Sequence, residues 1–202
     1  MTARAAWLLP LLAAGCTGQP LWQPLHCGDP QRGWRSSEFG GDGTIAFADD
    51  TLELGMGNPL TGVTATGTIP NGDYELEFEA ARRLGNDFFC GLTFPVGDAH
   101  LTLILGGWGG ALCGFSSLDG LDAARNATRT LRHFPRDAFV RIRLTVTPNE
   151  VAAFVDGQPL CSCDPGRHRL SLRPEVELSR PLGVAAFSTA ASLRGMRWRP
   201  RR

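Results

Sequence analysis

Apolar and polar residues alternate in short runs along most of the chain from residue 21 onward, and Gly, Pro, Asn and Asp separate these runs. A period of two residues is typical of a strand with one buried and one solvated face, whereas the separating residues are typical of tight turns. The clearest case is the segment 74–81, where Tyr74, Leu76 and Phe78 alternate with glutamates. The pattern predicts strands over residues 44–47, 51–54, 74–81, 88–94, 101–105, 111–115, 139–147, 151–155, 169–172 and 183–189.

Many short strands without long helical segments between them predict an all-β fold. No segment has the length and period of the helices that connect parallel strands. Asp156 and Gly157 lie between two apolar runs and predict a tight hairpin with local pairing. Residues 118–137 carry fewer strand signals, so we expect a long loop with one helical turn between residues 122 and 129. We expect residues 17–202 to form a single domain, a two-sheet antiparallel jelly-roll sandwich.

Residues 1–16 have the pattern of an export signal. Arg4 precedes an apolar run over residues 5–14, and Gly15 and Cys16 follow it. The run is shorter than the roughly 20 residues that a transmembrane helix needs. Because small residues directly before Cys16 resemble a lipobox, we expect cleavage before Cys16, its acylation and a membrane anchor on the bacterial cell envelope. The alternative is a plain secretory signal, with a secreted or periplasmic product.

Charge and cysteine content narrow the range of partners and covalent links. The 20 basic residues, all of them arginine, balance 20 acidic residues. A net charge of zero gives no long-range attraction for nucleic acid, so we expect no nucleic-acid partner. With Cys16 assigned to lipidation, we expect the other five cysteines to be mostly free, buried thiols. Five arginines between residues 194 and 202 predict a solvated strand end in preference to an anion-binding site.

Eight segments share a pattern of glycines, aromatic residues and strand-forming residues: 33–34 (GW), 39–43 (FGGDG), 59–63 (PLTGV), 74–80 (YELEFEA), 87–98 (DFFCGLTFPVGD), 106–110 (GGWGG), 114–117 (GFSS) and 173–177 (RPEVE). Together they resemble the bacterial 3-keto-disaccharide hydrolase family of the concanavalin A-like lectin and glucanase superfamily. The resemblance implies a curved sandwich whose concave face or rim accepts a sugar, and in some members hydrolysis of a 3-keto-glycoside. Typical members carry a histidine-containing motif near the C-terminus, where residues 183–189 of this chain read GVAAFST.

A 3-keto sugar changes the chemistry that hydrolysis requires. The ketone acidifies the neighbouring C–H, so a base can remove that proton before the aglycone leaves and water adds. The site must then supply a base and a group that stabilises the enolate oxygen, such as an arginine, a metal or backbone N–H donors. Ordinary glycosidases instead use two carboxyl groups on either side of the glycosidic bond.

Five polar residues are the candidates for these catalytic roles: Asp87, Asp98, His100, Arg173 and Glu175. Asp87 precedes an apolar strand, and Asp98 and His100 follow a Pro-Val-Gly turn, so we expect the two groups at neighbouring strand ends. Alternation places Arg173, Glu175 and Glu177 on one face of an extended strand. The alternatives are turn capping for the aspartates, a surface or supporting position for His100 and an ordinary ion pair for Arg173 and Glu175.

Four further residues are candidates for substrate binding: Asn86, Trp108, Asp119 and Asn126. Trp108 lies among four glycines, which fits either a ring displayed at a loop tip to stack on a sugar or a ring packed over a hairpin with positive φ. Asp119, Asp122 and Asn126 fall in the predicted long loop. Their oxygens suit a divalent metal such as calcium or a capped turn, but their spacing matches no EF-hand, so we assign no metal ligands.

The pattern and the resemblance together predict an exported carbohydrate-active protein, with a carbohydrate ligand or substrate, that hydrolyses 3-keto-glycosides or disaccharides. Two alternatives use the same fold. A non-catalytic carbohydrate-binding module predicts an aromatic platform at Trp108 without a base beside it. A structural or interaction domain predicts a groove that is filled by side chains.

Overall fold

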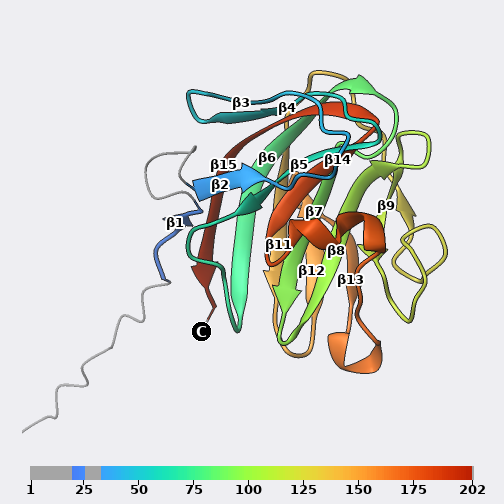
Figure 1. Cartoon of the computed structure of the whole chain (residues 1–202). Coiled ribbons are helices and arrows are strands. Elements are labelled where there is room, and N and C mark those ends of the chain that lie inside the picture. Colours follow the sequence, from blue (N-terminus) through green and yellow to red (C-terminus); the bar gives the residue numbers. More distant parts are fainter. Residues whose placement is uncertain (1–19, 26–32, 202) are drawn as a thin grey trace, which may run out of the picture.

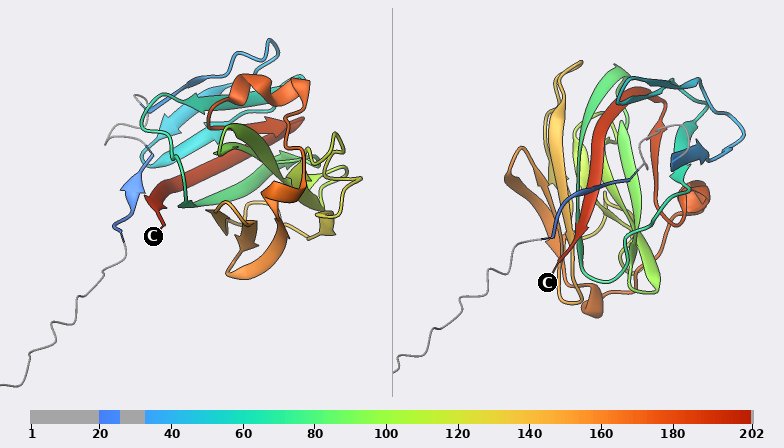
Figure 2. Two further views of the ribbon diagram at one scale, coloured as in Figure 1. Left: turned by 90° about the horizontal axis from the view of Figure 1, so that it is seen from below. Right: turned by 90° about the vertical axis from the view of Figure 1, so that its left-hand side faces the viewer.

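Two antiparallel β-sheets form the protein in a computed structural model that describes residues 20–25 and 33–201. The sheets lie face to face as two layers (Figures 1 and 2). This arrangement confirms the predicted all-β sandwich, because strands with alternating apolar residues bury one face by packing on a second sheet. Among the described residues, no helix is long and apolar enough to cross a membrane. The predicted export signal and Cys16 lie outside the described residues.

The first sheet, sheet A, has the order β13-β12-β11-β6-β15-β4-β3, and β1 pairs with β15. Its strands are β1 (Gln23–Pro24), β3 (Ile45–Ala48), β4 (Thr51–Leu54), β6 (Tyr74–Gly85), β11 (Val140–Val146), β12 (Val151–Val155), β13 (Gln158–Cys163) and β15 (Thr189–Pro200). The two long strands β6 and β15 lie side by side in its middle (Figure 1).

The second sheet, sheet B, has the order β10-β9-β8-β7-β14-β5-β2. Its strands are β2 (Trp34–Ser36), β5 (Leu60–Ala65), β7 (Cys90–Val96), β8 (Ala99–Gly107), β9 (Leu112–Ser116), β10 (Thr130–Leu131) and β14 (Gly183–Phe187). Two short 3₁₀ helices are η1 (Pro165–Arg167) and η2 (Pro174–Ser179). Helix η2 lies on the outer face of sheet B against β5 and β14, where the Thr64 hydroxyl donates to the Leu178 carbonyl.

The core lies between the sheets and follows from the alternation in both. In β6, Leu76 and Phe78 point inward and are almost fully buried, as the sequence predicted. They belong to the same core cluster as Leu92, Phe94 and Leu103 of sheet B. Burial of each such side chain contributes about 1.5–3 kcal/mol to the hydrophobic term.

The outer face of sheet A carries a row of ion pairs. The glutamates of β6 that alternate with the core residues bind arginines of β15, with N···O distances of 2.7 Å for Arg194–Glu79, 2.5 Å for Arg197–Glu77 and 2.5 Å for Arg199–Glu75. The arginine-rich end of the chain is therefore a solvated strand, as predicted. The partly exposed pair Arg194–Glu79 is of a kind that contributes about 0–1 kcal/mol, whereas Arg199 and Glu75 are mostly buried.

Most of the predicted strands are confirmed, as is the hairpin at Asp156 and Gly157, which joins β12 to β13. The expected helical turn is present as one turn, in which the amides of Arg125 and Asn126 both donate to the Asp122 carbonyl. The short strands β1, β2 and β10 and the longer β5 were not predicted, and β13 and all of β15 beyond Thr189 also lie outside the predicted strand ranges, although the hairpin at residues 156–157 and the solvated strand end at residues 194–202 indicated parts of them.

Two predictions around residues 169–177 are wrong. Residues 169–172 form only an isolated bridge at Leu170, because their backbone pairs with the loop at residues 117–121 and not with a strand. Residues 173–177 are not extended, because Pro174 begins the 3₁₀ helix η2 and Arg173 is its N-cap residue. Arg173, Glu175 and Glu177 therefore do not share the face of a strand.

The described cysteines are free thiols: Cys90, Cys113, Cys161 and Cys163. Burial raises the pKa of Cys113 to about 11 and that of Cys163 to about 11, so both are protonated at neutral pH. This confirms the expectation of mostly free, buried cysteines for the described part of the chain. Cys27 lies outside the described residues.

Replacement of Phe115 tests the packing between the sheets. Its ring is fully buried in β9 and lies 6.2 Å from that of Phe94, centroid to centroid. Because Phe115→Ala leaves a cavity, we expect a loss of about 3–5 kcal/mol in the free energy of unfolding, measured with urea. Leu131→Ala, at a side chain that is 63% exposed, should change it by less than about 0.5 kcal/mol. Equal losses in the two variants would contradict this account of the core.

Candidate functional site

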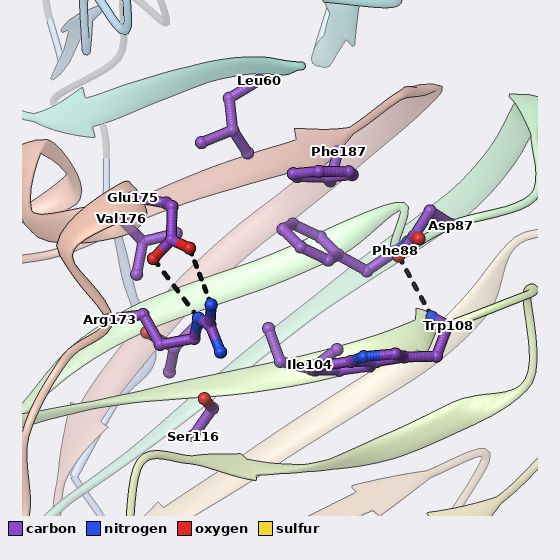
Figure 3. A pocket seen from close by; sticks show the side chains of 11 residues that line it. Leu60, Asp87, Phe88, Ile104, Trp108, Ser116, Arg173, Glu175, Val176 and Phe187 are labelled. Atoms are coloured by element: carbon purple, nitrogen blue, oxygen red, sulfur yellow. Dashed lines mark hydrogen bonds and ion pairs between the residues drawn. The ribbon is translucent and has the colours of Figure 1, made fainter. Parts of the chain in front are cut away.

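A pocket of about 200 Å³ opens on the outer face of sheet B, between the β8–β9 loop and η2. Strands β5, β8, β9 and β14 supply its floor because every second residue of each strand points away from the core. Figure 3 shows the side chains that surround it. The lining residues are Leu60, Asp87, Phe88, Thr102, Ile104, Trp108, Ser116, Arg173, Glu175, Val176 and Phe187.

Aromatic and aliphatic side chains dominate the pocket. The rings of Phe88 and Phe187 are 5.6 Å apart, with an angle of 39° between their planes. The indole of Trp108 lies alongside Ile104 (Figure 3). Trp108 is 47% exposed although it is large and apolar. The pocket therefore offers ring faces to a ligand, one of them at a solvent-exposed rim.

The Trp108 loop, defined as residues 106–111 and so including the last two residues of β8, combines the two conformations considered for it. The indole is displayed at the pocket, and the backbone of Trp108 has a φ of +46°. Such a φ is uncommon outside glycine, so the loop needs support from its surroundings. Asp87 supplies part of it, because its Oδ1 accepts hydrogen bonds from the backbone amides of Phe88 at 2.7 Å and Trp108 at 3.1 Å. Asp87 thus caps backbone groups, the alternative considered for it, and also lines the pocket.

An ion-pair group lies across the pocket from Asp87 and Trp108 (Figure 3). Arg173 donates from Nη2 to Glu175 Oε1 at 2.7 Å and from Nε to Oε2 at 3.3 Å. Its Nη1 donates to Asp122 Oδ2 at 3.2 Å. These hydrogen bonds lower the pKa of Glu175 and raise that of Arg173, so both groups are charged at neutral pH. The ion pair expected for Arg173 and Glu175 is present, and it faces the pocket.

Asp98 and His100 are not at a neighbouring strand end, which corrects the prediction. Asp98 belongs to the turn between β7 and β8 and His100 to the start of β8, whereas Asp87 precedes the opposite end of β7. Asp98 lines a separate, open depression that includes His168. His100 has both ring nitrogens buried without a hydrogen-bond partner among the described residues, and burial together with Arg180 lowers its pKa.

Of the four residues predicted to bind substrate, Trp108 lines this pocket and the other three do not. Asn86 is exposed. Asp119 binds His168 at 2.7 Å and the Arg169 amide at 2.8 Å. The Asn126 amide nitrogen donates to the Leu121 and Asp122 carbonyls of its own loop and to the Phe115 carbonyl of β9, and its oxygen accepts from Thr128, so it ties the loop to β9.

Metal binding was considered for the oxygens of this loop. Asp122 instead accepts hydrogen bonds from Arg125 and Arg173, and Asp119 pairs with His168. Within residues 20–25 and 33–201, no group of three or more His, Cys, Asp or Glu side chains is placed to hold an ion. The described residues therefore give calcium no evident ligand set.

Sequence analysis missed the apolar lining residues Leu60, Phe88, Ile104, Val176 and Phe187 and the two hydroxyl residues Thr102 and Ser116. A signal was present for Ile104, which alternates with the core residues Leu103 and Leu105 and must point outward. Phe88 lies just before β7 and Phe187 ends β14, and only the position of β14 beside β7 brings these distant segments together.

The Arg173–Glu175 pair predicts how the stability of the fold depends on pH. The folded-state pKa of Glu175 lies below its value of 4.5 in an unstructured chain, so the pair stabilises the fold above about pH 4.5 and loses this effect as pH falls through the folded-state pKa. Arg173→Gln should raise the pKa of Glu175 toward 4.5, measured by carboxyl ¹³C NMR titration. The titration of Asp119, whose pKa is lowered chiefly by His168, should not move. An unchanged Glu175 titration would contradict the role of Arg173.

The sequence of this chain matches no family model and no curated protein. Membership of the 3-keto-disaccharide hydrolase family is therefore not shown and stays a hypothesis.

The structure, in contrast, is similar to solved structures. A Bacillus subtilis protein of unknown function with a galectin-like fold has a TM-score of 0.63 at 17% identity, over 92% of this chain and 98% of that chain. A β-glucanase from Bacillus licheniformis has a TM-score of 0.56 at 8% identity, over 92% and 100%. A carbohydrate-binding module from Bacillus subtilis has a TM-score of 0.52 at 12% identity, over 81% and 93%. At these identities the likeness shows the fold alone, and the chain has the two-sheet jelly-roll fold of galectin-like and β-glucanase structures.

Proposed function

We propose that this chain is a carbohydrate-binding protein whose ligand occupies the pocket on the outer face of sheet B. One observation carries the proposal: Trp108 is 47% exposed at the rim of a pocket that also presents the charged pair Arg173–Glu175. A sugar ring has an apolar face of C–H groups and an edge of hydroxyls. An exposed indole can stack on the apolar face, and a paired guanidinium and carboxylate supply donors and acceptors for the hydroxyl groups.

The size of the pocket favours a small ligand. Its volume of about 200 Å³ is below the roughly 300–1,000 Å³ of most drug-sized ligand sites, so one or two sugar rings are the expected occupant. The pocket is also open. For a purely structural or interaction domain we predicted instead a groove filled by side chains. The proteins of similar fold support the same class of ligand, because they include a β-glucanase and a carbohydrate-binding module.

Hydrolysis of 3-keto-glycosides is the second candidate, and one arrangement favours it. Arg173 and Glu175 lie together at the pocket, where a base and a cation are what this chemistry needs. Glu175 would take the proton from the carbon next to the ketone, and the electron pair left behind would form an enolate stabilised by Arg173. Expulsion of the aglycone and addition of water would follow. Asp87 is the other pocket carboxylate, whereas Asp98 and His100 lie elsewhere.

Export and anchoring belong to the same proposal. The predicted lipobox ending at Cys16 would place the pocket outside the cytoplasm, where glycans of the envelope or the surroundings are available. Cys16→Ala should abolish the incorporation of a labelled fatty acid into the protein.

Truncation of Trp108 tests the binding proposal. We expect Trp108→Ala to weaken the binding of glucosides or of glycans identified on an array by at least about tenfold, because the exposed indole is the main stacking surface. Isothermal titration calorimetry measures the change in Kd. Trp22→Ala is the matched control, since Trp22 packs against Arg197 and Arg199 on the outer face of sheet A, away from the pocket. Equal binding by all three proteins would exclude the pocket as the site.

A comparison of two substrates tests the hydrolysis of 3-keto-glycosides. p-Nitrophenyl β-glucoside and its 3-keto form differ only in the group that acidifies the C–H, so release of p-nitrophenol from the keto form alone supports the second candidate. Glu175→Gln should then reduce the rate by about 10²-fold or more. Saturable binding without release from either compound, with and without divalent metal, would make the protein a binding module only.

A further inference from the structure

Arg82 is a charged residue at a position that alternation assigns to the core. It continues the inward row of β6 that contains Leu76, Phe78 and Ala80, and it is 8% exposed. Its guanidinium carbon lies 5.3 Å from the centroid of the Phe89 ring. Among the described residues no carboxylate forms an ion pair with it, and its Nε has no hydrogen-bond partner. Burial lowers the pKa of Arg82, and the charge of Asp87 partly offsets this effect.

Arg82 is tied to both ends of the Trp108 loop. Its Nη2 donates to the Gly106 carbonyl at 3.1 Å and to the Gly110 carbonyl at 2.7 Å, so these two hydrogen bonds bracket Trp108. The approach is so close that a Cβ on Gly106 would lie 2.2 Å from Nη2. Asp87 holds the same loop at the Trp108 amide. The loop is thus fixed at three backbone groups.

We propose that Arg82 is a positioning residue for the sugar pocket, which holds the Trp108 loop in the conformation that binds the ligand. This inference rests on the function proposed above. A guanidinium buried without a carboxylate partner is costly, and an apolar side chain of similar size would serve the core better. A loop with glycines at positions 106, 107, 109 and 110 has many conformations available to it. If Arg82 fixes the loop before the ligand binds, binding does not have to include the entropy cost of ordering the loop.

The test compares Arg82→Met with Arg83→Met in the whole protein. Methionine keeps most of the apolar stem but donates no hydrogen bond. Arg83 is the matched control because it points to the other face of β6, where it binds Ser192 and Asp137. All tryptophans are replaced by 5-fluorotryptophan, and the Trp108 resonance is assigned by its loss in Trp108→Phe. Without any ligand, Arg82→Met should narrow and shift the Trp108 ¹⁹F resonance and leave the other resonances in place, whereas Arg83→Met should leave Trp108 unchanged.

Binding and stability separate a positioning role from a structural one. If Arg82→Met reduces the binding-competent fraction to about one tenth, its Kd for the glucoside probes rises about tenfold. The urea midpoint should stay the same or increase, because a buried charge is removed. Arg82→Lys, which keeps the charge but not the paired donors, should give an intermediate Kd, and it provides a second folded variant if Arg82→Met does not fold.

Each outcome of these experiments either supports or overturns the positioning role of Arg82. A mobile Trp108 with weaker binding at unchanged stability supports it. An unchanged Trp108 resonance in Arg82→Met overturns it, as does a mobile Trp108 with an unchanged Kd. Failure of the wild-type protein to bind any sugar would refute the proposed function instead, and the ligand-free ¹⁹F spectra would still decide whether Arg82 fixes the loop.

Discussion

Backbone pairing of β6 with β15 extends along both strands, from Thr189 opposite Gly85 to Pro200 opposite Tyr74. Much of the structure depends on this contact. It joins the C-terminal strand to the middle of sheet A, so the inward residues of both strands form one side of the core. It also sets the end of β6, and therefore the direction in which the chain crosses to sheet B. Cross-strand pairs between the β6 glutamates and the β15 arginines favour this register over one shifted by a residue.

The pocket forms because sheet B has two different faces. Its inner face packs against sheet A, whereas its outer face is only partly covered by η2. The pocket on the uncovered part is lined by Asp87 of the β6–β7 connection, Trp108 of the β8–β9 loop and Phe187 of β14. Because antiparallel strands alternate in direction, the end of one lies beside the start of the next, so segments as far apart in sequence as Leu60 and Phe187 meet on this face of the sheet.

The charges at this site explain why binding is the better supported function. Glu175 has both oxygens bonded to Arg173, and Asp87 uses Oδ1 to hold two backbone amides. The hydrogen bonds from Arg173 lower the pKa of Glu175, which makes this carboxylate a weaker base. The same pairing fixes the geometry of donors and acceptors, which is what recognition of hydroxyl groups requires. Catalysis by Glu175 would need the substrate to displace part of this pairing.

The amino-acid sequence by itself determined the all-β sandwich, because an inward apolar residue at every second position can be satisfied only by a sheet with a second layer over it. It also indicated Asp87 from its place before a strand and Trp108 from its place among glycines, whereas Arg173 and Glu175 were selected on an alternation that the structure does not have. Only the tertiary structure decided which of them meet. Pro174 turned a predicted strand into η2, and the hairpin of β7 and β8 carried Asp98 and His100 to the far end of the sheet. Alternation is a local property that a sequence displays, whereas the neighbours of an outward side chain depend on strand order, which is set by packing between residues far apart in the chain.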